Sequence, residues 1–185
     1  DMLSNGRLRL GFGRGLARRE FETFQIRMDE SRDRFDEEAP MIIEALETGF
    51  IEGNGPYYEQ PRTEIRPRPE YSFDGRIYAV ASSEESVMSA AKLGAHIIMF
   101  ADRPWEMRLP TIERGRSLHR EFHGTVPPNL MMTEFVICGT DLDQCEKEAR
   151  LYQGKFVESN FYHYEFLSDH FKSVKEYDSY QQKAE

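Results

Sequence analysis

The apolar and polar residues of the chain alternate between the patterns of short strands and of longer helices. The first predicted strand has apolar side chains at every second position. The next two are continuous apolar runs of the kind that is buried on both faces of a sheet. The four predicted strands are residues 7–13, 77–81, 95–100 and 130–138.

Helical patterns follow each of these strands. The first has an apolar stripe at positions i, i+4, i+7 and i+11, with Pro40 inside it. Ser82 with Glu85, and Asp141 with Gln144, predict capping boxes at the starts of the second and fourth helices. The predicted helices are residues 29–48, 84–93, 104–122 and 141–153.

Four repeats of strand and helix are typical of an α/β fold with a parallel sheet and right-handed crossovers. The length of 185 residues suits one domain. Two intervals fall outside this pattern. Residues 49–75, rich in glycine and proline, predict an irregular excursion, and residues 156–185 form an aromatic tail whose structure the weak periodicity does not predict.

Composition excludes several classes of function. The chain has 33 acidic and 24 basic residues, so its net charge of -9 argues against a general nucleic-acid binder and gives no attraction to an anionic membrane. No apolar run approaches the roughly 20 residues that span a bilayer. A signal-peptide pattern is not seen, and the two cysteines suit neither a disulfide scaffold nor a metal site. We therefore expect a cytoplasmic protein without metal.

Two predicted strand ends have the chemistry of an anion site. Ser82, Ser83 and Ser86 follow a buried strand where a helix begins, and helix N-termini favour phosphate. A simple capping box is the other interpretation, and the two glutamates that follow Ser83 would repel a dianion. Arg14, between two glycines after the first strand, and Arg32, near the next helix start, would supply positive charge.

Ordinary ion pairs on a solvated surface are the alternative for these arginines. In that case Arg14, Arg18, Arg19 and Arg32 pair with Glu20, Glu22, Asp29 and Asp36. Ligands of parallel α/β sheets, however, bind at the carboxyl ends of strands, where both candidate sites lie.

The histidines and cysteines give weaker indications. His96 in a buried strand favours a hydrogen-bonded core residue. His119 and His123 lie four apart on a helix, a spacing that permits a metal pair, but no third ligand accompanies them. His163 and His170 are available for acid–base chemistry. Cys138 is expected to be a buried core thiol.

Several collinear segments resemble the bacterial luciferase-like flavin monooxygenases. The resemblance covers most of the chain and is more specific than any single motif. The segments are LSNGRLRLGFGRG (3–15), ESRDRF (30–35), GNGPYY (53–58), IRPRP (65–69), YAVASSEES (78–86), AAKLG (90–94) and HYE (163–165).

This resemblance implies a (β/α)₈ TIM-barrel family, with flavin mononucleotide (FMN) at the carboxyl ends of the strands. The family's phosphate-binding positions match Arg14, Arg32, Ser83 and Ser86, with backbone help near Ser82. The implied reaction uses reduced FMN and O₂ to oxidise an organic substrate such as a long-chain aldehyde. A flavin reductase is the implied source of reduced FMN, and a dimer is the expected assembly.

The chain departs from the family in its length. A full barrel needs about 250 residues, whereas this chain resembles only the fourth to seventh strands. The family's catalytic histidine lies before the segment that matches, so no catalytic residue is assigned. We expect residues 1–185 to form a partial domain, either a fragment of a longer enzyme or a chain that pairs with another. A non-catalytic flavoprotein or partner subunit, and a deazaflavin-dependent oxidoreductase of the same superfamily, remain as alternatives.

Overall fold

The computed structural model describes residues 1–174, 177 and 180. The chain divides into two compact units. The sheet unit comprises residues 1–14 and 33–134, and the tail unit comprises residues 15–32 and 135–185.

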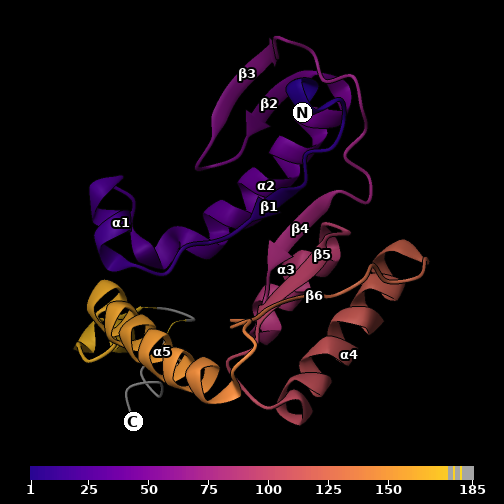
Figure 1. Cartoon of the computed structure of the whole chain (residues 1–185). Helices are drawn as coiled ribbons and strands as arrows, with labels where there is room; N and C mark the ends of the chain where they lie inside the picture. Colours follow the sequence, from indigo (N-terminus) through magenta and orange to yellow (C-terminus); the bar gives the residue numbers. More distant parts are fainter. Residues whose placement is uncertain (175–176, 178–179, 181–185) are drawn as a thin grey trace. The chain divides into compact units, whose positions relative to one another are not determined.

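A four-stranded parallel sheet forms the centre of the sheet unit (Figure 1). The spatial order is β1-β4-β5-β6, so the prediction of four parallel strands is confirmed. The outer two strands are shorter than the sequence pattern predicted. The bounds are β1 Leu10–Phe12, β4 Ile77–Val80, β5 His96–Phe100 and β6 Met131–Thr133.

Three longer helices accompany this sheet: α2 Ser31–Thr48, α3 Glu84–Lys92 and α4 Trp105–His123. Pro40 and Pro110 lie inside α2 and α4, and each helix continues past its proline. A Cβ at Gly115 of α4 would lie 2.8 Å from side-chain atoms of both Ile97 and Val87. Glycine at this position therefore lets α4 approach β5 and α3 closely. The core consists of buried apolar side chains such as Ala79, Val87, Ala90, Met99 and Leu118.

The prediction that residues 49–75 are irregular is wrong in part. Strands β2 Phe50–Asn54 and β3 Glu59–Glu64 form an antiparallel hairpin. The Glu37 carboxylate on α2 accepts hydrogen bonds from the backbone N–H groups of Tyr57 and Tyr58 and so holds the turn. The Arg62 guanidinium lies 3.7 Å from the centre of the Phe50 ring across the hairpin. Side-chain contacts therefore stabilise a hairpin that has little apolar alternation.

The tail unit holds two short helical segments, α1 Arg18–Thr23 and η2 Met28–Glu30, and the long helix α5 Leu142–Tyr164. Helix α5 does not end at residue 153 as predicted, because the first aromatic residues of the tail continue it. A 3₁₀ segment, η3 Asp169–Ser173, follows, and another, η1 Met2–Ser4, begins the sheet unit. Met28, Phe166, Phe171 and Tyr177 form a small buried core. Positions 175–176, 178–179 and 181–185 of the predicted tail lie outside the described residues.

Both predicted capping boxes need correction. Asp141 does cap α5, accepting hydrogen bonds from the backbone N–H groups of Asp143 and Gln144. The Gln144 side chain, however, donates to Glu148 at 2.8 Å instead of returning to the cap. At α3 the box uses Ser83 and Ser86, not Ser82 and Glu85. Among the described residues, no helix is both long and apolar enough to cross a membrane.

Candidate functional site at the carboxyl end of the sheet

The carboxyl end of the sheet brings two of the predicted segments to one edge. Strands β1 and β4 are parallel neighbours, with Phe12 opposite Ala79. The chain leaves β1 into Gly13 and half-buried Arg14, and it leaves β4 into Ala81, Ser82 and Ser83. Because the strands run in the same direction, Arg14 and Ser83 follow the same end of the sheet.

Three serines form a hydrogen-bonded cluster where β4 passes into α3. Ser86 Oγ accepts from the backbone N–H groups of Ser82 at 3.0 Å and Ser83 at 2.9 Å. Ser83 Oγ accepts from the Ser86 N–H at 3.2 Å, and the two hydroxyl oxygens lie 3.1 Å apart. The Ser86 hydroxyl donates to the Ser83 carbonyl at 2.9 Å, so in this structure the two loop amides and the Ser86 hydroxyl bond within the cluster at the N-terminus of a nine-residue helix.

The chemistry of this cluster fits a phosphate group. Ser86 Oγ already places one acceptor oxygen in front of two amide donors, and hydroxyl groups rotate to donate to a new acceptor. The dipole of α3 adds positive potential at the same place. Glu84 and Glu85 are both exposed, so water and ions screen their charge. A Cβ at Gly13 would meet nothing within 4 Å, which leaves space beside the first strand end.

Arg32 belongs to the tail unit. Its side chain is buried, as is that of Ser31 directly before it. The structure therefore places Arg14 and the serine cluster on one sheet, and it places Arg32 in the other unit.

The predicted surface ion pairs form only in part. Arg18 does pair with Glu22, at 3.4 Å, but its shorter contact is with Glu165 at 2.8 Å, a partner that the sequence did not indicate. The hydrogen bond from Arg18 holds the pKa of the Glu165 carboxyl below its ordinary value. Asp29 pairs instead with Arg27, and Asp36 accepts a hydrogen bond from Ser89.

The histidines serve structural contacts. His96 is hydrogen-bonded as predicted, to the carbonyl groups of Asn129 and Gly75, although it is only partly buried. The rings of His119 and His123 lie 4.7 Å apart. No group of three metal-ligating side chains occurs among the residues that the structure describes. His163 lies 3.1 Å from Glu20.

Cys138 is exposed, so its prediction as a buried thiol is wrong. The residue follows β6, which ends at Thr133 instead of continuing to Cys138. Without a neighbouring strand, this segment leaves the sheet and its side chains reach solvent.

Sequence reasoning missed an ion pair at the carboxyl end of β5. Asp102, two residues after the strand, pairs with Arg108 on α4. Arg108 is buried, and its Nε has no hydrogen-bond partner. An acidic residue two positions after a predicted strand was the available signal. This ion pair links the connection that follows β5 to helix α4.

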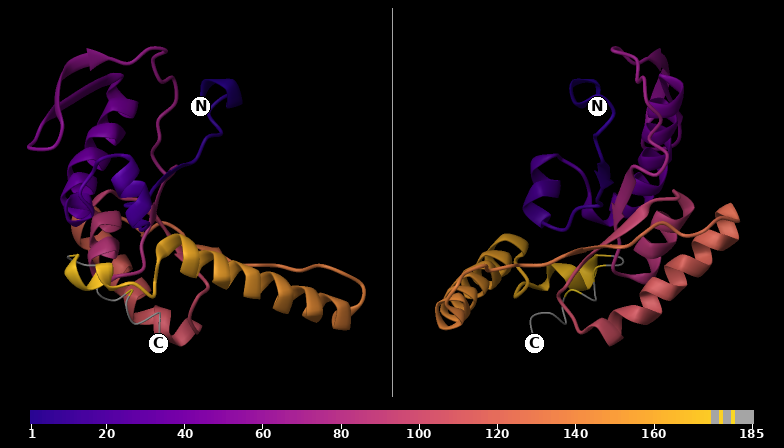
Figure 2. Two further views of the ribbon diagram at one scale, coloured as in Figure 1. Left: turned by 90° about the vertical axis from the view of Figure 1, so that its left-hand side faces the viewer. Right: turned by 45° about the vertical axis from the view of Figure 1, so that its right-hand side comes forward.

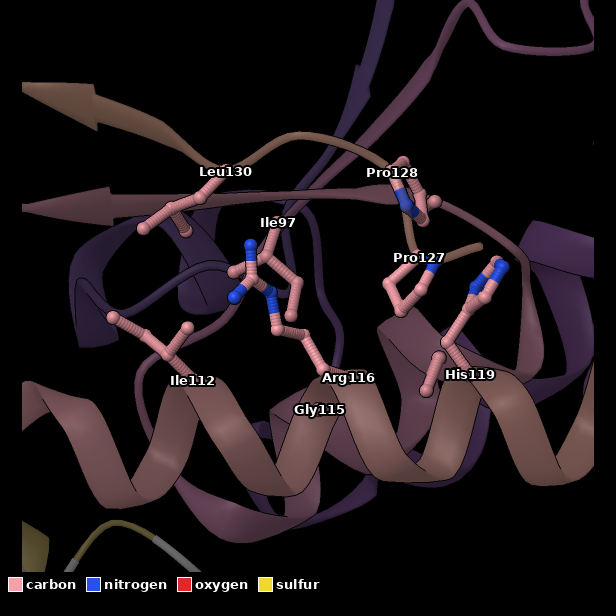
Figure 3. Close-up of a pocket in the computed structure, with 10 residues that line it drawn as sticks. Ile97, Ile112, Gly115, Arg116, His119, Pro127, Pro128 and Leu130 are labelled. Atoms are coloured by element: carbon pink, nitrogen blue, oxygen red, sulfur yellow. The ribbon is translucent and has the colours of Figure 1, made fainter. Parts of the chain in front are cut away.

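Each unit also contains a hollow. A cavity of about 20 Å³ lies between α4 and β5. Figure 3 shows Arg116, His119 and Pro127 among its lining residues. Its volume suits about one water molecule. The second, about 440 Å³, lies in the tail unit between residues 135–137 and α5, and Phe135 and Val136 in its wall are largely exposed. Figure 2 shows the extended length of α5 from two further sides.

Comparison with known proteins identifies alkanal monooxygenase chains among the relatives. The alkanal monooxygenase beta chain of Aliivibrio fischeri is 32% identical over 122 residues, 65% of this chain and 36% of the relative. The corresponding beta chain of Photorhabdus luminescens is 26% identical over 160 residues, 85% of this chain and 48% of the relative. The chain thus spans about half, or less, of the length of these relatives.

A solved structure agrees with this result. The crystal structure of monooxygenase RslO1 from Streptomyces bottropensis matches with a TM-score of 0.66 and 28% identity, over 88% of this chain and 49% of that one. The four parallel strands with their helices are therefore part of an α/β barrel. The profile of the family described as luciferase-like monooxygenase matches residues 1–185, and the chain belongs to that family.

Proposed function

We propose that this chain carries the flavin-phosphate side of the site in a monooxygenase that uses reduced FMN and O₂ to oxidise an organic substrate such as an aldehyde. One observation carries the proposal. Arg14 and the Ser82–Ser83–Ser86 cluster follow the carboxyl ends of adjacent parallel strands. This edge combines a guanidinium with a helix N-terminus, the two features that proteins use most to bind phosphate.

Each residue of the proposed site has a distinct role. The Arg14 guanidinium supplies charge and paired N–H donors. The Ser82 and Ser83 amides and the Ser83 and Ser86 hydroxyls supply neutral donors at the start of α3. Arg32 is included on the resemblance to the family. When bound, reduced flavin supplies the electrons for oxygen chemistry, and the chain's own contribution is to bind and orient it.

The relatives support the substrate class and the assembly. Those named above are alkanal monooxygenase beta chains, and alpha chains also match, one of them from Aliivibrio fischeri at 35% identity over 68 residues. We propose that this protein also acts on an aldehyde-like substrate with O₂, receives reduced FMN from a flavin reductase, and forms a dimer. We also propose that residues 1–185 are one partial domain of a cytoplasmic enzyme that binds neither nucleic acid nor membrane.

A non-catalytic partner subunit is the second candidate function. The apolar hollow along α5, with Phe135, Val136 and Leu142 mostly exposed, favours it because such surfaces are usually covered by another chain. Turnover of a long-chain aldehyde with supplied reduced FMN and O₂ would identify the enzyme, whereas flavin binding without turnover would identify the subunit. A deazaflavin cofactor would be recognised by the absorbance spectrum of the purified protein.

The phosphate site is tested by comparing FMN with riboflavin, which lacks the phosphate. Arg14→Ala should weaken FMN binding about 5- to 150-fold, or about 1–3 kcal/mol for a charge-assisted contact, and leave riboflavin binding unchanged. Fluorescence titration of the flavin measures both affinities. Arg9→Ala is the matched control, because Arg9 is exposed and precedes β1 at the opposite end of the strand. Unchanged FMN affinity in the Arg14 variant would refute the proposed site.

A further inference from the structure

A single tyrosine of the tail unit connects the two ends of the segment between β1 and α2. The Tyr177 hydroxyl donates to the Gly15 carbonyl at 3.0 Å and lies 3.0 Å from Ser31 Oγ. A phenol has one proton, and a carbonyl oxygen only accepts. Ser31 must therefore donate to Tyr177, so the phenol oxygen both gives and receives a hydrogen bond.

The two hydrogen-bond partners of Tyr177 are sequence neighbours of the candidate arginines. Gly15 directly follows Arg14, and Ser31 directly precedes Arg32. One hydroxyl group therefore bonds to the residue next to each of these arginines in the sequence. The three residues that form these two bonds all lie in the tail unit.

Packing around Tyr177 makes this anchor rigid. Its ring is fully buried and stacks on Phe171, with centres 6.2 Å apart. The same segment is held a second time by Arg18, which donates to both carboxylate oxygens of Glu165 at 3.1 and 2.8 Å. The hydrogen bond between Ser31 and Tyr177 is buried, so water does not compete for it and the chain at residue 31 is well fixed, whereas the bond to exposed Gly15 is only partly buried.

From these contacts we propose that Tyr177 is a positioning residue for the phosphate site. It acts through Ser31, which directly precedes Arg32 in the same unit, and thereby sets the orientation of Arg32. This inference rests on the proposed function. A guanidinium gains most from phosphate when its two N–H groups are already aligned, so a looser backbone weakens recognition of the phosphate and leaves contacts to the rest of the flavin unchanged.

The variant Tyr177→Phe keeps the ring and removes only the hydroxyl. We expect its FMN affinity to fall about 3- to 10-fold while its riboflavin affinity stays within twofold of the parent protein. Tyr164→Phe is the matched control, since the Tyr164 ring packs against Phe166 of the same cluster, 5.4 Å between centres. That variant should retain the preference of the parent protein for FMN over riboflavin.

The outcomes distinguish a wrong positioning role for Tyr177 from a wrong phosphate site. If Arg14→Ala lowers the preference for FMN and Tyr177→Phe does not, or if Tyr177→Phe weakens both flavins equally, the positioning role is wrong. If Arg14→Ala leaves the preference unchanged, the phosphate site itself is wrong and the inference falls with it. Should Tyr177→Phe fail to fold, Ser31→Ala removes one of the two hydrogen bonds with the tail intact. That variant must show the same selective loss, and an unchanged preference would overturn the proposal.

Discussion

Replacing Arg76 should destabilise the sheet unit more than any exposed arginine does. Arg76 directly precedes β4, and its guanidinium forms an ion pair with Asp1 at 2.8 Å. The two side chains are only 12% and 11% exposed. The guanidinium also donates to the backbone carbonyl groups of Gly6, Leu8, Tyr71 and Ser72.

The expected loss of stability follows from the interactions that Arg76→Met removes. Methionine keeps the length of the side chain and its packing near the Phe73 ring, which lies 4.3 Å from the guanidinium carbon. The loss is therefore the charge and its hydrogen bonds. Removing one partner of a buried ion pair costs about 3–5 kcal/mol. Because both side chains retain slight exposure, we expect about 3 kcal/mol.

Urea unfolding followed by tryptophan fluorescence is the appropriate assay. Trp105 is the only tryptophan, and it lies on α4 in the same unit as Arg76. Arg66→Met is the control, because Arg66 is 80% exposed and pairs with nearby Glu64, so it should change stability by less than about 0.5 kcal/mol. A cost below about 1 kcal/mol for Arg76→Met would refute the reasoning.

This prediction also concerns the candidate site. The Leu10 N–H donates to the Arg76 carbonyl at 3.0 Å, so Arg76 lies where β1 and β4 begin to pair. The register of that pair places Arg14 and Ser83 at the other end of the same strands. The double variant Asp1→Asn/Arg76→Met should cost less than the sum of the single variants, because the neutral amide no longer leaves a buried charge unpaired.

Two further predictions concern pH and backbone conformation. Burial, with smaller contributions from His123 and Arg120, lowers the pKa of His119 below 6.5. Because the fold favours the neutral imidazole, its contribution to the free energy of unfolding is fully present above pH 6.5 and falls as the pH drops below that value. Urea unfolding between pH 5 and 7 should show this slope, and His119→Gln should flatten it; an equal slope in both proteins would contradict the assignment. Gly15 has φ +88° and a Cβ there would lie 3.2 Å from Phe21, so Gly15→Ala should cost about 1–2 kcal/mol in thermal or urea unfolding followed by circular dichroism. Gly13→Ala, in open space, should cost much less, and equal losses would show that backbone strain is not the cause.

The sequence predicted those elements whose buried residues form a recognisable pattern of apolar positions along the chain. The apolar runs of β4 and β5 predicted both strands, and the alternation of strands with helices predicted the parallel sheet. The expectation that both faces of these strands are buried is wrong, because Val80 and Phe100 are exposed. Long helix α5 was underestimated because none of its residues is buried. A helix without a buried face has no apolar stripe to show where it ends. The hairpin β2–β3 was missed for a similar reason, since most of its residues are exposed or only partly buried.

At the candidate site, the sequence by itself determined which residue types follow each strand, and hence that guanidinium and hydroxyl groups are present. Tertiary structure decided which of them interact. The choice of Ser83 with Ser86, over Ser82 with Glu85, depends on where the chain leaves β4 and turns into α3. The bond from Tyr177 to Gly15 spans 162 positions, and Arg18 with Glu165 spans 147. Contacts between residues so far apart leave no local pattern, because they depend on how the whole chain packs.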